Sequence, residues 1–107
     1  NQRKKGYDAG VKSDLRNAAT AEETYLTDHY AYSAESPVND SATGELGAEG
    51  FKYSTKTDYD SQVQAITVVL GPQGNDSYCL DATSASGKLW VYDSSAGGLQ
   101  PSGTAAC

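Results

Sequence analysis

An amphipathic repeat in the first thirty residues constrains the fold of this chain more than any other feature. At about 100° per residue, six apolar or aromatic side chains fall within one arc of about 100°, the width of a face that packs on a core. These residues are Tyr7, Val11, Leu15, Ala18, Tyr25 and Leu26. The repeat predicts a helix within residues 1–32, one face of which needs another element to cover it.

The predicted helix has no clear start in the sequence. The basic run Arg3, Lys4 and Lys5 leads directly into the repeat, with no capping residue placed cleanly before Tyr7. Two glycines follow the run, and each lowers helix stability by up to about 1 kcal/mol relative to alanine. We therefore expect a helix that is weakly held at its start and firmer over 11–30.

Two acidic side chains interrupt the apolar face. Glu22 lies in the middle of the arc and Asp14 at its edge. Because isolated carboxylates usually stay in water, the favoured interpretation is a half-covered helix with both acids at a solvated rim. The alternative is that these charges are directed at a neighbouring subunit.

A third sector of the predicted helix carries only short side chains. Its members are Ala9, Ser13, Thr20, Thr24 and Thr27. Such a surface would let a second helix approach closely, although ordinary solvent-facing residues would look the same.

The remainder of the chain predicts an antiparallel sheet. The segments are a Ser/Gly/Pro-rich loop over 33–60 with a turn of helix near Glu45, a short strand over 51–57, strands over 61–70, 77–83 and 88–93, and a coil over 94–107. Short turns join the last three strands, which is typical of a meander. We predict a single α+β domain over 1–107, in which the amphipathic helix packs on a three- to four-stranded antiparallel meander in 61–93.

The chain contains two cysteines, Cys79 and Cys107. A disulfide between them would close a loop of about 29 residues and contribute up to roughly 3.6 kcal/mol to stability. That contribution would matter for so small a core and would indicate an oxidising compartment. The alternative is a pair of unrelated buried thiols.

No catalytic set is evident in the sequence. His29 is the only histidine, and one histidine with scattered serines does not define a nucleophile, a base and an orienting acid. Two cysteines and one histidine match no metal-binding spacing, and no phosphate-binding or dinucleotide-binding glycine pattern occurs. We expect a non-enzymatic protein without a metal or cofactor.

The charge distribution argues against nucleic-acid binding. The formal net charge is −6 at pH 7, and the excess of acidic side chains lies in 31–107. Nucleic-acid binding depends instead on clustered Lys and Arg that displace counterions. No stretch is long and apolar enough to span a membrane and no signal peptide is evident, which for a secreted protein predicts a mature or trimmed chain.

Several phrases of the sequence resemble the soluble part of bacterial type IV pilins and pilin-like proteins. The helical stretch YDAGVKSDLRNAATAEETYLTDHYAYS is followed by the glycine-rich ELGAEGFKYS and, after a strand, by SYCLDATSASGKLWVYDSSAGGL. The phrases KSDLRNAATAEETY, and YCL followed by SGKLWVYDS, are similar to those of pilins from Gram-positive bacteria. The resemblance extends over nearly all of the chain.

In that family the mature chain begins with a strongly hydrophobic helical half, and an amphipathic half then packs on an antiparallel sheet. The resemblance implies that residues 1–32 are the amphipathic half and that the hydrophobic half has been removed. Before assembly that half would lie in the membrane, with Arg3, Lys4 and Lys5 near the lipid headgroups. In the filament it would bundle with the same segment of other copies.

The resemblance also implies that Cys79 and Cys107 bracket a C-terminal region on the surface of the subunit. Trp90 and Tyr92 fall on one face of the strand inside that region, and Leu89 and Val91 on the other. We expect Trp90 in the core, but the sequence does not decide which face meets the helix.

Three functions follow as hypotheses. The first is a structural subunit of an extracellular type IV pilus-like filament, anchored in the membrane before assembly, that polymerises with copies of itself and with other pilins for adhesion, motility or DNA uptake. The second is a pseudopilin of a type II secretion or competence system. The third, from a different class, is a secreted binding module or adhesin whose helix is complete.

Overall fold

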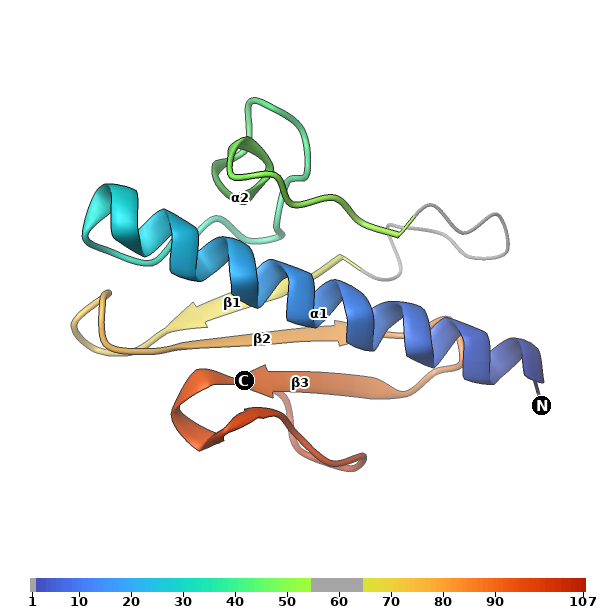
Figure 1. Cartoon of the computed structure of the whole chain (residues 1–107). Coiled ribbons are helices and arrows are strands. Elements are labelled where there is room, and N and C mark those ends of the chain that lie inside the picture. The colour runs from blue at the N-terminus through green and yellow to red at the C-terminus, as the bar shows by residue number, and fades with distance from the viewer. Residues whose placement is uncertain (1, 55–64) are drawn as a thin grey trace.

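A computed structural model describes residues 2–54 and 65–107, with side chains from Gly6 onward. A long helix is followed by a short one and then by four strands, with a 3-10 turn before the last strand (Figure 1). The elements are α1 (Gln2–His29), α2 (Glu45–Ala48), β1 (Thr67–Leu70), β2 (Tyr78–Thr83), β3 (Leu89–Asp93), η1 (Ser94–Ala96) and β4 (Gly98–Leu99).

The four strands form one antiparallel sheet in the order β1-β2-β3-β4. Helix α1 has 28 residues and lies across one face of this sheet (Figure 1). The molecule measures 42 × 29 × 16 Å, and its longest dimension matches the roughly 42 Å expected of such a helix. The predicted fold class, a long helix packed on an antiparallel meander, is confirmed.

The helix-facing side of the sheet carries the aromatic face of β3. In the strand register Ala82 lies opposite Trp90, and Leu80 opposite Tyr92. Leu80 is fully buried, Trp90 is 7% exposed, and Tyr92 packs partly buried against the same core. The aromatic face therefore meets α1, and Trp90 lies in the core as expected.

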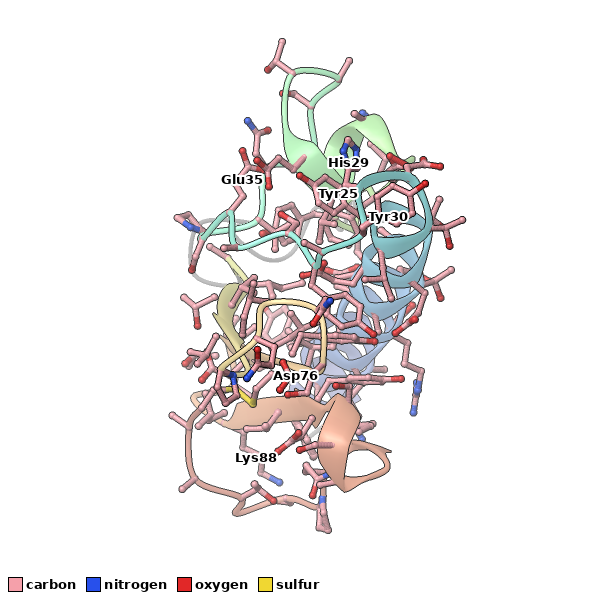
Figure 2. The ribbon with its side chains drawn as sticks, turned by 90° about the vertical axis from the view of Figure 1, so that its left-hand side faces the viewer. Tyr25, His29, Tyr30, Glu35, Asp76 and Lys88 are labelled. Atoms are coloured by element: carbon pink, nitrogen blue, oxygen red, sulfur yellow. A yellow bond between two sulfur atoms is a disulfide. The ribbon has the colours of Figure 1, made fainter. Side chains whose placement is uncertain are left out.

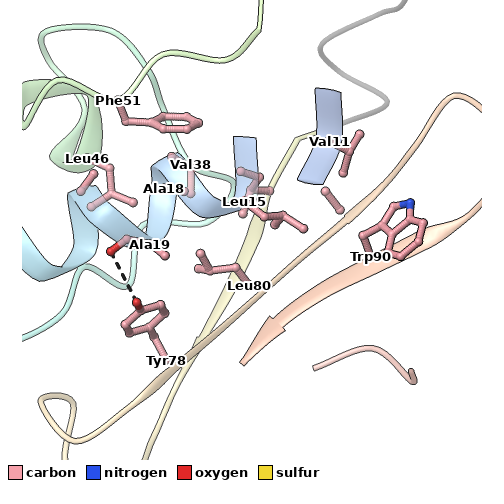
Figure 3. Close-up of a cluster of buried hydrophobic side chains, with 13 residues drawn as sticks. Val11, Leu15, Ala18, Ala19, Val38, Leu46, Phe51, Tyr78, Leu80 and Trp90 are labelled. Atoms are coloured by element: carbon pink, nitrogen blue, oxygen red, sulfur yellow. Dashed lines mark hydrogen bonds between the residues drawn. The ribbon is translucent and has the colours of Figure 1, made fainter. Parts of the chain in front are cut away.

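The predicted apolar face of α1 differs in burial along its length. Val11, Leu15 and Ala18 are buried in the central cluster with Leu80 (Figure 3). The remaining three predicted residues, Tyr7, Tyr25 and Leu26, are half-buried. Two more alanines, Ala19 and Ala21, also belong to the core.

The loop between α1 and β1 covers a second side of α1. Its buried side chains Val38, Leu46 and Phe51 join the core (Figure 3). The loop also runs along the outer edge of β1: the Val38 amide donates to the carbonyl oxygen of Ile66, just before the strand, at 2.8 Å, and the Val68 amide donates to the Ser36 hydroxyl at 3.0 Å. The turn of helix predicted near Glu45 is present as α2.

The fourth strand is not where the sequence suggested. Of the strand predicted over 51–57, the described part, 51–54, is irregular, and Phe51 is buried without forming a ladder. The fourth strand is instead β4, in the tail over 94–107 that was predicted to be entirely coil. The strand predicted over 61–70 appears from Thr67, and positions 61–64 lie outside the described residues.

Helix α1 ends slightly earlier than the predicted boundary. Tyr30 follows the helix with a φ of 61°, a left-handed conformation that is unusual for a bulky residue. Its amide still donates to the Leu26 carbonyl oxygen at 2.8 Å, which closes the last turn. After Tyr30 the chain passes beside the connection between β1 and β2, and the Tyr32 amide donates to the Gly74 carbonyl oxygen there.

Candidate functional site

The solvent-facing side of α1 is exposed along the helix, from Ala9 to Asp28. Its threonine hydroxyls donate to carbonyl oxygens one turn earlier in the helix, at 3.2 Å for Thr20, 3.2 Å for Thr24 and 3.1 Å for Thr27. These hydroxyl groups therefore have hydrogen-bond partners within the helix itself. The predicted smooth sector, Ala9, Ser13, Thr20, Thr24 and Thr27, is exposed throughout.

The basic run lies in the first turns of α1. The backbone of Arg3, Lys4 and Lys5 is helical, while their side chains lie outside the described part of the structure. The run therefore lies at the N-terminal end of α1, the end opposite Tyr30. The suggested role of the run near a membrane stays a prediction.

Asp14 is buried, which corrects the prediction that it lies at a solvated rim. The side chain is 2% exposed. Its Oδ1 accepts hydrogen bonds from the Ser54 amide at 3.0 Å and from the Ser54 hydroxyl at 2.6 Å. The carboxyl group therefore ties the end of the described α1–β1 loop to the middle of α1.

Glu22 is also buried, so the rim interpretation is wrong for this residue too. The side chain is 0% exposed, and its Oε1 accepts a hydrogen bond from the Ser33 amide at 2.7 Å. Burial raises the pKa of Glu22 to about 7; the Ser33 hydrogen bond opposes this rise, while the charges of Glu23 and Glu45 add to it. Since the carboxyl is used inside the molecule, it is not available to a neighbouring subunit.

Further hydrogen bonds extend from Ser33 through the loop. The Ser33 hydroxyl donates to Glu45 Oε1 at 2.7 Å and accepts from the Glu35 amide at 3.2 Å. The Glu45 amide in turn donates to Glu35 Oε1 at 2.9 Å. Despite these carboxylates, no group of three potential ligands in the described chain is arranged to hold a metal ion.

The N-terminal part of α1 contacts β3 and the turn between β2 and β3. The Lys12 ammonium lies 4.3 Å from the centre of the Trp90 ring, and the Ser86 hydroxyl donates to Asp8 Oδ1 at 2.6 Å. Partial burial raises the pKa of Asp8, but the Ser86 hydrogen bond and the charge of Lys88 contribute to a net lowering. These contacts hold the rod on the sheet near its basic end.

Cys79 and Cys107 form a disulfide, with 5.9 Å between their Cα atoms, as predicted. Cys79 follows Tyr78 in β2 and so faces away from α1. The Cys107 amide also donates to Asp81 Oδ2 at 2.9 Å. The tail therefore crosses the face of the sheet opposite the helix, where Val91 is 3% exposed.

Two grooves flank the exposed side of α1. One, of about 290 Å³, lies between α1 and the α1–β1 loop. The other, of about 260 Å³, lies between α1 and the β3–β4 connection. The second is lined by Ala19, Thr20, Glu23, Tyr78, Tyr92, Ser94, Gly97 and Gly98.

Aromatic side chains lie close together at the C-terminal end of α1. Figure 2 shows Tyr25, His29 and Tyr30 close together there, and the rings of Tyr25 and His29 stack with 4.0 Å between their centres. Tyr30 is 82% exposed. His29 is the last residue of α1, and its described contact is this stacking on Tyr25.

Sequence reasoning missed two structural features of this helix. The first is the role of Asp14 and Glu22 as loop anchors, which the central position of Glu22 in the apolar arc could have indicated. The second is the groove beside Glu23, which depends on residues more than fifty positions away and leaves no local signal.

Within the described residues, no helix is long and apolar enough to cross a lipid bilayer. No protein-family model matches the chain, and no curated protein matches it in sequence.

Proposed function

We propose that this chain is the globular part of a structural subunit of a type IV pilus-like filament. The observation that carries the proposal is the arrangement of α1, which buries one face on an antiparallel meander and leaves the opposite face exposed along the rod. The C-terminal disulfide behind the sheet supports the same assignment. Both features are those expected from the resemblance of the sequence to pilins.

In this proposal α1 continues, in the full-length protein, from an apolar helical half. That half holds the subunit in the membrane before assembly and bundles with its copies in the filament afterwards. Arg3, Lys4 and Lys5 would then lie near anionic headgroups, where each basic side chain contributes on the order of 1 kcal/mol of attraction. The partners are other copies of this chain and other pilins, and the tasks are adhesion, motility or DNA uptake.

Direct nucleic-acid binding is not part of the proposal. The described body of the protein is acidic outside α1, and clustered basic side chains are what duplex binding requires. DNA uptake would therefore depend on another subunit of the same filament. The absence of a catalytic constellation in the sequence leaves a structural role as the proposed one.

The gene region that precedes Asn1 provides the first test. A reading frame encoding some 20 or more apolar residues, next to a prepilin-type cleavage site, would support the filament proposal. A conventional signal peptide would instead favour a secreted binding module with a complete helix.

Electron microscopy of cells with and without the gene provides the second test. Loss of surface fibres on deletion, with recovery on complementation, is the expected result. Fibres of unchanged number and appearance would contradict a role as the main filament subunit. A secretion defect without any loss of surface fibres would instead support the pseudopilin alternative.

A further inference from the structure

The groove between α1 and the β3–β4 connection lies next to the exposed face of α1. Tyr78 and Tyr92 line it from the sheet, and their rings are parallel, with centres 6.2 Å apart. Gly97 and Gly98 also line it, where the chain enters β4. A Cβ atom at Gly98 would meet the Tyr92 ring at 3.4 Å, and the φ of +106° there also favours glycine. The missing side chains leave space beside the tyrosines.

The groove carries an uncompensated negative charge. Glu23 lines it from α1, and its Oε2 accepts a hydrogen bond from the Tyr32 hydroxyl at 3.1 Å. No lysine or arginine pairs with Glu23 in the described part of the chain. Burial raises the pKa of Tyr78, and the charge of Glu23 raises it further. A carboxylate beside tyrosine rings matches a cationic side chain, which pairs with the acid and stacks on an aromatic face.

The same face of α1 carries a matching cation. Arg16 is exposed, and within the described residues its guanidinium has no partner. Arg16 and Glu23 are seven residues apart, which places them on one line of the helix about 10 Å apart along its axis. A parallel copy displaced by about two helical turns would therefore bring its Arg16 to the Glu23 groove.

We propose that the Glu23 groove receives the Arg16 guanidinium of a second copy of this chain. The inference rests on the proposed filament, in which all copies of α1 run parallel. The arginine would bind the Glu23 carboxylate through its planar fork and lie against Tyr92. Each subunit would then donate one arginine to a neighbour and accept one from another, so the contact repeats along the filament without closing on itself.

A charge-swap experiment in cells that express the full-length protein tests this pairing. Three variants are compared: Arg16→Glu, Glu23→Arg, and the two combined. Each single reversal places like charges at every contact and should lower the number of fibres per cell by about tenfold or more. The combined variant restores opposite charges and should bring the number back to at least about half of the wild-type value.

Matched controls separate pairing from general charge effects. Lys52→Glu makes the same charge change as Arg16→Glu on an exposed side chain outside this groove, whose ammonium donates to the Asp40 carbonyl oxygen at 2.8 Å. Asp28→Arg matches Glu23→Arg on the same helix. Both controls should leave fibre number within about twofold of wild type, since isolated surface changes have small effects. Immunoblots and thermal melting check that each variant accumulates and folds.

The outcomes distinguish the pairing from the filament proposal. Normal fibres in both single reversals, or no recovery in the combined variant, would overturn the pairing while the chain stays a filament subunit. Loss of fibres in the controls to the same extent would also overturn it. If deletion of the gene leaves all fibres in place, the chain is not the main filament subunit and the proposed function, rather than the pairing alone, is contradicted.

Discussion

At the scale of single residues, two acids of α1 determine how the α1–β1 loop is held. Asp14 and Glu22 are eight residues apart, and both are buried with loop amides as hydrogen-bond donors. Asp14 accepts two hydrogen bonds from Ser54, whereas Glu22 accepts one from Ser33. Glu22 Oε2 has no partner within the described residues. The buried carboxyl group of Glu22 is therefore compensated by the Ser33 amide on one oxygen only.

The raised pKa of Glu22 predicts a specific dependence of stability on pH. Between its ordinary value of 4.5 and about 7, Glu22 is protonated in the folded chain and ionised in the unfolded one. The folded state then binds more protons, so the contribution of Glu22 to stability is largest at low pH and is lost as the pH rises towards 7. Above pH 7 the buried charge is a net cost.

Replacing Glu22 with glutamine should therefore stabilise the protein at pH 8. We expect a gain in the free energy of unfolding of about 1–3 kcal/mol at pH 8 and little gain at pH 4.5. Urea unfolding at the two pH values measures the difference. Asp28→Asn, on an exposed acid of the same helix, is the control, and equal gains at both pH values for Glu22→Gln would contradict the assignment.

At the scale of elements, the contact between α1 and the sheet depends on a narrow strip of side chains. Leu15 is at its centre, 0% exposed and surrounded by Leu80 and the α1–β1 loop (Figure 3). Alanines occupy neighbouring positions on the same face, which lets the helix approach the sheet closely. Few large side chains therefore provide most of the buried apolar area of the helix.

Leu15→Ala should accordingly destabilise the chain by about 2–5 kcal/mol, because it removes a buried side chain and leaves a cavity. Urea unfolding at one pH gives the difference. Asn17→Ala, exposed two residues further on, should change the free energy of unfolding by less than about 0.5 kcal/mol. A loss below about 1 kcal/mol for Leu15→Ala would mean that α1 is not packed as described.

Elements with a strong local pattern were predictable, and those that depend on distant partners were not. The period of α1 and the alternation in β2 and β3 are visible in the sequence. Strand β4, however, has two residues, Gly98 and Leu99, and exists only because β3 offers an edge to pair with. Local patterns also gave no sign that Ser33 and Ser54 would cover Glu22 and Asp14.

At the scale of the whole molecule, the disulfide closes a three-layer arrangement of helix, sheet and tail. Cys107→Ser should remove roughly 3–4 kcal/mol of stabilisation. For a chain of this size, that corresponds to a fall in melting temperature of about 15 °C or more. Calorimetry measures the fall, and reduction of the wild-type protein should reproduce it.

Ala106→Ser is the neighbouring control for the disulfide variant, since it adds a hydroxyl at the adjacent position and keeps the bond. Its melting temperature should stay within about 2 °C of wild type. If Cys107→Ser melts at the same temperature as this control, the tail does not contribute to stability through the disulfide.

The position of the tail also makes Cys107 a fixed attachment point. Cys107 is bonded to Cys79 in strand β2, and its amide donates a hydrogen bond to the Asp81 carboxylate. A peptide or fluorophore fused after Cys107 would therefore emerge from one defined location, on the side of the molecule opposite the long helix. Such a fusion would suit surface display, because it would extend away from the helix and leave the rod uncovered.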